Sequence, residues 1–132
     1  TTFTEEAKET TLSIDPKRFR DALTNLIDNA VKYTPKDGKI TIHGEIALHP
    51  IEKTKLYRLT ITDTGIGMTE EEKQKIFTRL FERGSIAKEM NATGRGIGLM
   101  LTKQIVEAYG GVIHAESAGR DTGSVFVVEM PV

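Results

Sequence analysis

The chain has 132 residues, a length that suits one domain and allows a buried core without disulfides. It contains no cysteine, which excludes disulfides and thiolate metal sites, and its net charge of −1 argues against a broad nucleic-acid surface. No apolar run approaches the roughly 20 residues that span a bilayer, and the polar beginning lacks the apolar stretch of a signal peptide. We therefore expect one cytoplasmic domain, residues 1–132, without direct contact to membrane or nucleic acid.

The N-terminal part predicts two short strands and then a long helix. Thr2–Glu6 and Thr10–Ile14 read as the strands. Asp15 is a good N-cap residue, and Pro16 suits the first helical position, where its missing N–H is not needed. Pro35 ends the helix. Apolar residues at helical spacing form the predicted core face: Phe19, Ala22, Leu23, Leu26, Ile27, Ala30 and Val31.

The rest of the chain alternates strands and helices. Lys39–Leu48 and Lys55–Asp63 alternate as two antiparallel strands. A helix over Thr69–Phe81 begins with a capping box formed by Thr69 and Glu72. One more helix and two strands follow, over Gly98–Tyr109, Val112–Glu116 and Ser124–Met130. These elements predict an α+β fold, a two-layer α/β sandwich with a mixed, mostly antiparallel sheet and three helices on one face.

A polar stripe runs along the first long helix. Asn25, Asn29 and Lys32 lie at i, i+4 and i+7 and so share one face. Asparagine is a poor residue for a helix interior, because its amide competes for backbone hydrogen bonds. The stripe fits a solvated face or a ligand face equally well. An amide oxygen suits Mg²⁺, and a lysine pairs with phosphate.

The segment Asp63-Thr64-Gly65-Ile66-Gly67 follows directly after a predicted strand. Aspartate at a strand end is often only a turn former. The two glycines add a second possibility, because they let the backbone approach a flat ligand while Asp63 accepts a hydrogen bond from an exocyclic amine. A carboxylate in that position favours adenine over guanine, whose carbonyl would face another acceptor.

Three alternate glycines, Gly94, Gly96 and Gly98, precede Leu99 where the last helix begins. Backbone N–H groups at a helix N-terminus bind anions, so this segment fits an anion site. A flexible loop without a ligand is also rich in glycine and fits the same sequence. The segment is neither the dinucleotide fingerprint nor a phosphate-binding Walker A loop, because the preceding strand and the Gly-Lys-Ser/Thr sequence are both missing.

The order of these motifs resembles the Bergerat-fold ATPases, the family of gyrase B, the ninety-kilodalton heat-shock chaperone, histidine kinases and the mismatch-repair protein MutL. Within this family, the sequences of the motifs are most similar to the catalytic, ATP-binding domain of sensor histidine kinases. The matching segments cover the chain after Leu12 and are Asn25–Pro35, Asp63–Met68, Gly94–Leu99 with Thr102–Glu107 and Gly110-Gly111, and Gly123–Phe126.

The resemblance implies a site for ATP and Mg²⁺. Asn29 resembles the Mg²⁺ ligand, and Asp63 resembles the carboxylate that reads adenine, with Gly65 and Gly67 beside the base. Ser124 is implied to support Asp63 through a water molecule. The residues implied around the metal, the phosphates and the lid hinge are Asn25, Lys32, Tyr33, Gly94, Gly96, Gly98 and Leu99.

The resemblance also implies a lid over the phosphates, formed by residues 84–93. Phe77 and Phe81 stand in the phenylalanine box, one residue further apart than is typical. The arginine that contacts phosphate is therefore left open between three residues, Arg79, Arg83 and Arg95. The implied catalytic residues are Asn25, Lys32, Arg83 and Arg95.

No histidine of the chain has the sequence context of a phosphoacceptor. His43 and His114 lie in predicted strands, and His49 lies in a loop next to Pro50. The implied reaction is phosphoryl transfer from MgATP to a histidine on a separate dimerisation domain of the parent kinase, and from there to a response regulator. An anti-sigma-type serine kinase, an ATP-hydrolysing clamp and a non-catalytic nucleotide-binding module of the same fold remain alternatives.

Overall fold

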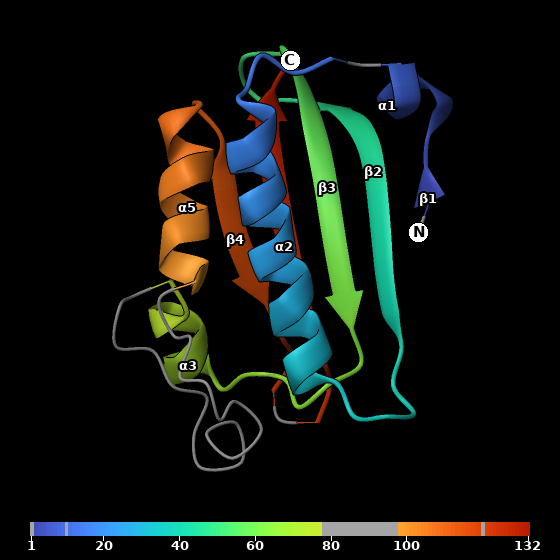
Figure 1. Ribbon diagram of the computed structural model, residues 1–132, viewed down its shortest axis with the longest axis vertical. Coiled ribbons are helices and arrows are strands. Elements are labelled where there is room, and N and C mark those ends of the chain that lie inside the picture. Colours follow the sequence, from blue (N-terminus) through green and yellow to red (C-terminus); the bar gives the residue numbers. More distant parts are fainter. Residues whose placement is uncertain (1, 10, 78–97, 120) are drawn as a thin grey trace.

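The computed structural model describes residues 2–9, 11–77, 98–119 and 121–132. Three helices, α2, α3 and α5, lie on one face of the sheet in Figure 1, which confirms the predicted α+β sandwich. The elements in chain order are β1 (Thr2–Phe3), α1 (Glu5–Glu9), α2 (Pro16–Tyr33), β2 (Ile40–Leu48), β3 (Lys55–Asp63), α3 (Glu70–Lys75), α5 (Gly98–Ala108), β4 (Val112–Glu116) and β5 (Ser124–Pro131).

The five described strands form one sheet in the order β1-β2-β3-β5-β4. β1 runs parallel to β2, and the other neighbours are antiparallel, as the mixed sheet predicted. In the central strand β3, Asp63 pairs with Ile40 on one side and with Ser124 on the other. The end of β3 therefore lies between the first residues of β2 and β5. This end of the sheet also lies at the C-terminal end of α2 (Figure 1).

Helix α2 begins as predicted, because the Asp15 side chain accepts a hydrogen bond from the backbone N–H of Lys17 and Pro16 takes the first position. The predicted core face is partly wrong. Ala22, Leu26 and Ala30 are buried, whereas Ile27 is 36% exposed and Val31 is 58% exposed. The buried stripe instead continues through Asn29 and Tyr33. Small alanines on this stripe let the helix approach the sheet closely, and Ile27 and Val31 then fall to its flank.

The N-terminal segment differs from its prediction. The first strand ends at Phe3, because the Thr4 hydroxyl accepts a hydrogen bond from the backbone N–H of Ala7 and starts α1. The predicted strand over Thr10–Ile14 is wrong, since residues 11–14 pair with no strand. Leu12 and Ile14 pack against the core from this connection, so their alternation reflects burial without strand pairing.

Helix α3 begins with the predicted capping box: the Thr69 hydroxyl accepts from Glu72 N, and the Glu72 carboxylate accepts from Thr69 N. The helix ends at Lys75, six residues before the predicted end at Phe81, which lies outside the described residues. No described helix is both long and apolar enough to cross a membrane.

The sheet face opposite the helices carries a cross-strand charge cluster. Arg58 Nε and Nη2 donate to one carboxylate oxygen of Glu129, at 3.0 and 2.9 Å, and Nη1 lies 3.4 Å from Glu45. The hydrogen bond with Glu129 is the main reason that the pKa of Arg58 is raised above its ordinary value. These three residues link β2, β3 and β5 across the open face.

Candidate functional site

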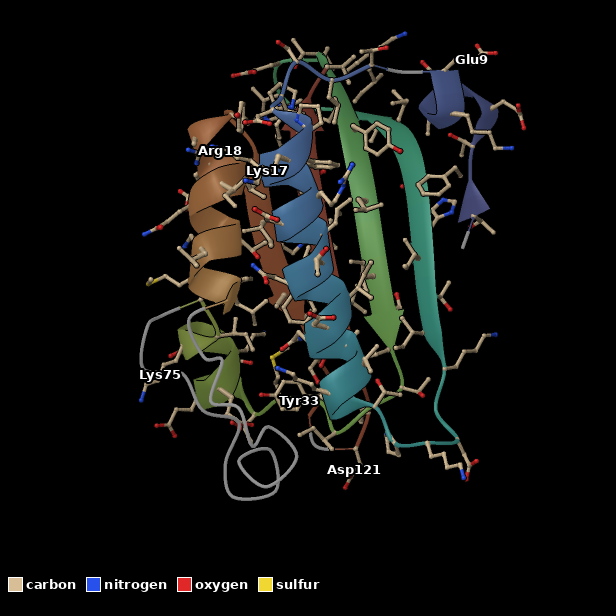
Figure 2. The ribbon with its side chains drawn as sticks, viewed as in Figure 1. Glu9, Lys17, Arg18, Tyr33, Lys75 and Asp121 are labelled. Carbon is tan, nitrogen blue, oxygen red and sulfur yellow. The ribbon has the colours of Figure 1, made fainter. Side chains whose placement is uncertain are left out.

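The C-terminal end of α2 and the loop after β3 form one tightly packed junction. Ile66 N donates to the carbonyl of Tyr33 at 3.0 Å, and Thr64 N donates to the carbonyl of Lys39 at 3.1 Å. A Cβ atom at Gly65 would lie only 2.0 Å from the Tyr33 carbonyl oxygen, so no larger residue fits without a backbone shift. Figure 2 shows Tyr33 at this end of α2. The predicted glycine requirement at position 65 therefore has a physical cause.

Asp63 is a buried carboxylate, with 3% of its surface exposed. Its Oδ1 atom accepts hydrogen bonds from the backbone N–H groups of Gly65, at 2.9 Å, and Ser124, at 3.2 Å. Burying a carboxylate is costly unless hydrogen bonds compensate, and two backbone donors also fix its orientation. A carboxylate has about four acceptor positions, so Asp63 can accept a further donor from a ligand.

The described residues between β4 and β5, 117–119 and 121–123, form a turn that holds the same loop from its other side. Asp121 N donates to Ile66 O at 2.7 Å, and Gly123 N donates to Gly65 O at 3.1 Å. Gly67 has a φ of 69°, and a Cβ atom there would lie 2.0 Å from Gly119 O. The loop is thus clamped between α2 and the β4–β5 turn, which keeps its backbone in one conformation.

The polar stripe on α2 leads toward this junction. Asn29 lies one helical turn before Tyr33 and is 8% exposed, so a solvated face does not describe it. Within the described residues, its Nδ2 atom is buried and makes no hydrogen bond. Asn25 and Lys32 are half-buried. A buried amide without a partner usually marks a missing ligand or water.

Asn29 fits a role toward MgATP, although the described residues contain no cluster of three or more His, Cys, Asp or Glu side chains that could hold a metal alone. Mg²⁺ is commonly held by one or two protein oxygens together with substrate phosphates and water, so such a cluster is not required. A half-turn of the Asn29 amide exchanges its oxygen and nitrogen. The Asn29 side chain can therefore offer its oxygen to a metal ion or its N–H groups to a phosphate oxygen.

Two cavities lie near the candidate residues. One, of about 450 Å³, is lined by Asp63 and Ser124 together with Lys73 of α3 and residues of the β4–β5 turn, including Ser117. A larger groove of about 770 Å³ lies between α2 and α5 and contains only Asn25 of the candidate residues. The cavity at Asp63 is the candidate for the base site expected from the sequence, because a buried, oriented acceptor determines recognition more than volume does.

Some of the remaining candidate residues have a described position, and others do not. α5 begins at Gly98 as predicted, Leu99 is buried, and α2 and α5 lie side by side in Figure 1. Ser124 contacts Asp63 directly through its backbone N–H, whereas the expected water-mediated contact stays a prediction. Six named candidates lie outside the described residues: Arg79, Phe81, Arg83, Gly94, Arg95 and Gly96.

The three histidines occupy the predicted kinds of element. His43 lies in β2 with its Nδ1 atom 2.7 Å from the Thr2 hydroxyl, and His114 lies in β4. His49 follows β2, and its Nδ1 atom accepts from the N–H groups of Ile51 and Glu52. Two of the histidines, His43 and His49, thus have hydrogen-bond partners outside the candidate site.

Sequence reasoning missed the β4–β5 turn as part of the site. Its residue Ser117 bonds the N–H of Met68, 49 positions away, and Gly119 packs against Gly67. The signal present in the sequence was a serine followed by two glycines, Gly119 and Gly123, which also suits any hairpin turn. Only the three-dimensional pairing of β3 with β5 brings this turn to Asp63.

The fold is that of a Bergerat-type ATPase domain. The chain belongs to the family described as histidine kinase-, DNA gyrase B- and HSP90-like ATPase, which it matches over residues 14–132. This agrees with the family resemblance of its motifs.

Among curated proteins, the chain is 39% identical over 122 residues to the adaptive-response sensory kinase SasA of Synechococcus elongatus, covering 92% of this chain and 29% of that protein. It is 33% identical over 118 residues to the sensor histidine kinase WalK of Bacillus subtilis, covering 89% of this chain and 18% of that protein. The chain thus spans less than a third of these relatives.

Solved structures show the same fold. The catalytic domain of the histidine kinase ThkA superposes with a TM-score of 0.74 at 29% identity, covering 98% of this chain and 76% of that chain. The mycobacterial sensor histidine kinase MprB superposes with a TM-score of 0.69 at 27% identity, covering 91% of this chain and 76% of that one. The fold is that of histidine kinase catalytic domains.

Proposed function

We propose that this domain binds MgATP at the junction of α2 and the β3–α3 loop and transfers the γ-phosphoryl group to a histidine on a separate dimerisation domain. The observation that carries the proposal is the buried carboxylate of Asp63, held by Gly65 N and Ser124 N beside a glycine loop. Family membership and the kinase names of its relatives agree with it.

Adenine would be read at Asp63. The fixed carboxylate would accept a hydrogen bond from the 6-amino group, and close packing of Gly65 against Tyr33 O and of Gly67 against Gly119 O holds the neighbouring loop in place. Guanine carries a carbonyl at the same position, so two acceptors would face each other in a buried site. Such a mismatch costs about 1–3 kcal/mol, and more where a charge is involved.

The phosphates would lie along α2 toward the N-terminal end of α5. Asn29 would hold Mg²⁺ or a phosphate oxygen, with Asn25, Lys32 and Tyr33 nearby on the same helix, and the backbone at Gly98 and Leu99 begins α5. Bound Mg²⁺ supplies neutralisation of the charge on the phosphates. The lysine and the helix N-terminus add positive charge from the chain itself. Arg83, Arg95, Gly94 and Gly96 belong to the same proposal, without a described position.

Transfer requires a nucleophile from another domain. The imidazole nitrogen of the accepting histidine forms a bond to the γ-phosphorus while the bond from phosphorus to the bridging oxygen breaks, and ADP leaves. Catalysis of this kind consists mainly of positioning and charge stabilisation, which a rigid site on a helix and a sheet end can supply. The phosphohistidine would then serve a response regulator in two-component signalling.

The test is incubation of the domain with γ-labelled ATP and Mg²⁺, with and without a separate dimerisation domain from the same parent protein. We expect acid-labile label on the added domain and none on this chain. Asp63→Asn should abolish most of the transfer, while Asp121→Asn, in the neighbouring exposed turn, serves as a charge-matched control. Acid-labile label on this chain alone would contradict the proposed division of labour. Acid-stable label on a serine of a partner would support the serine-kinase alternative.

A further inference from the structure

Ser117 stands at the point where β4 passes into the turn toward β5, and its hydroxyl makes several contacts. The Oγ atom accepts a hydrogen bond from Met68 N at 3.0 Å and lies 2.7 Å from Gly123 O and 3.1 Å from Gly119 O. A hydroxyl has one proton to donate, and the shorter distance assigns it to the carbonyl of Gly123. Ser117 is therefore bonded to both the β4–β5 turn and the end of the loop after β3.

The carbonyl of Gly123 and the N–H of Ser124 belong to the same planar peptide group. That N–H donates to Asp63 Oδ1 at 3.2 Å. One rigid unit is thus held at its oxygen by Ser117 and holds Asp63 through its nitrogen. Hydrogen bonds arranged in such a chain strengthen one another, because the first polarises the peptide group that makes the second.

The hydrogen bond between Ser117 and Met68 fixes the far end of the loop that follows β3. Asp63 lies at the start of this loop, and Met68, which is fully buried, lies at its end. The backbone N–H of Met68 donates to Ser117 Oγ. The same turn also reaches the middle of the loop, through Asp121 N and Ile66 O. Figure 2 shows Asp121 and Tyr33 at the same end of the domain, and Ile66 links them through its hydrogen bonds to Asp121 N and Tyr33 O.

We propose that Ser117 is a positioning residue for adenine recognition, acting through the Gly123–Ser124 peptide on the carboxylate of Asp63. This inference rests on the proposed function, since it names a residue that prepares the base site for ATP. Ser117 also lines the cavity at Asp63, but in this scheme its hydroxyl acts on adenine through Asp63 and not by a hydrogen bond of its own to the nucleotide. Its effect is to keep the Asp63 carboxylate oriented before the nucleotide arrives, which lowers the cost of binding.

The experiment compares Ser117→Ala with Thr122→Ala. Thr122 lies in the same turn, and its hydroxyl lies 2.6 Å from Gly119 O and 3.4 Å from Ser117 Oγ, but among the described residues its side chain makes no hydrogen bond to Met68 N or Gly123 O. Calorimetric titration should show about a tenfold loss of ATP affinity for Ser117→Ala and less than about a twofold loss for Thr122→Ala. Ser117→Thr keeps the hydroxyl and should recover most of the affinity.

Two readouts separate positioning from general loosening of the turn. The loss in Ser117→Ala should largely disappear for purine riboside triphosphate, which lacks the 6-amino group that Asp63 would read. It should also shrink in an Asp63→Asn background, because two residues acting through one contact are not additive. In NMR spectra, the amide proton of Ser124 should exchange faster with solvent in Ser117→Ala than in Thr122→Ala.

Equal losses for both nucleotides, or additive effects of Ser117→Ala and Asp63→Asn, would overturn the inference while leaving ATP binding intact. Equal affinities of Ser117→Ala and Thr122→Ala would do the same. Absence of ATP binding by the unmodified chain is a different result, which removes the proposed function and the inference together. Thermal unfolding of each variant confirms that the compared proteins are folded.

Discussion

Substituting Gly65 by alanine should disturb both the fold and nucleotide binding. The new Cβ would lie 2.0 Å from the Tyr33 carbonyl oxygen, whereas ordinary contacts begin near 3.4 Å, so about 1.4 Å must be relieved. The neighbouring atom belongs to the backbone, and moving it also stretches the hydrogen bond from Ile66 N to Tyr33 O. Forced insertion of this kind costs about 1–3 kcal/mol of stability.

The matched control is Gly111→Ala, at the far end of the domain where α5 meets β4. A Cβ there would lie 2.5 Å from Met130 Sδ and 2.7 Å from Glu129 O, a comparable overlap away from the site. Both variants should unfold at lower denaturant concentration, but only Gly65→Ala should lose ATP affinity, by about tenfold or more, in calorimetric titration at a temperature where both are folded. Unchanged ATP affinity in Gly65→Ala would refute the assignment of this junction to the base site.

Two further predictions concern the metal and the open face of the sheet. In Asn29→Ala, the enhancement of ATP binding by Mg²⁺ should largely disappear, and an enhancement equal to that of the unmodified chain would exclude Asn29 and favour Asn25. Arg58→Met should lower the free energy of unfolding by about 1 kcal/mol, less at high salt, without changing ATP affinity. Because the pKa of Arg58 is raised, its contribution is present below the unfolded-state pKa and is lost only as pH rises through the folded-state pKa, so the difference should stay constant across the neutral range. A clear drop of that difference between mildly acidic and mildly alkaline pH would contradict this assignment.

The sequence predicted those elements whose local signals agree with their packing. Asp15 and Pro16 start α2, Thr69 and Glu72 start α3, and the alternation in the second half of Lys55–Asp63 indicates β3. In each case a capping side chain or a two-residue period acts within a few positions of the chain. The observed elements agree with these local signals.

The sequence failed where burial and secondary structure diverge. Leu12 and Ile14 are packed against the core from an irregular segment, which short alternation cannot distinguish from a strand. Val31 follows the helical period of α2 but falls on its exposed flank, because the sheet approaches the side of Asn29 and Tyr33. Which flank of a helix is covered depends on the neighbouring sheet.

The candidate residues of the site can be named from the sequence, but the contacts that support them cannot. Asp63 and Gly65 are recognisable from a short motif after a strand. The role of Ser117 and of the Ser124 backbone depends on the register between β3 and β5, which places residues about 60 positions apart opposite each other. No local pattern in the sequence encodes that register.

The most direct test of the account is calorimetric titration of the unmodified domain with ATP and with GTP, both with Mg²⁺. The buried carboxylate of Asp63 predicts saturable binding of ATP and at least about tenfold weaker binding of GTP, and Asp63→Asn should remove most of the affinity for ATP. Equal affinity for the two nucleotides, or unchanged ATP binding in Asp63→Asn, would contradict the proposal that this carboxylate reads adenine.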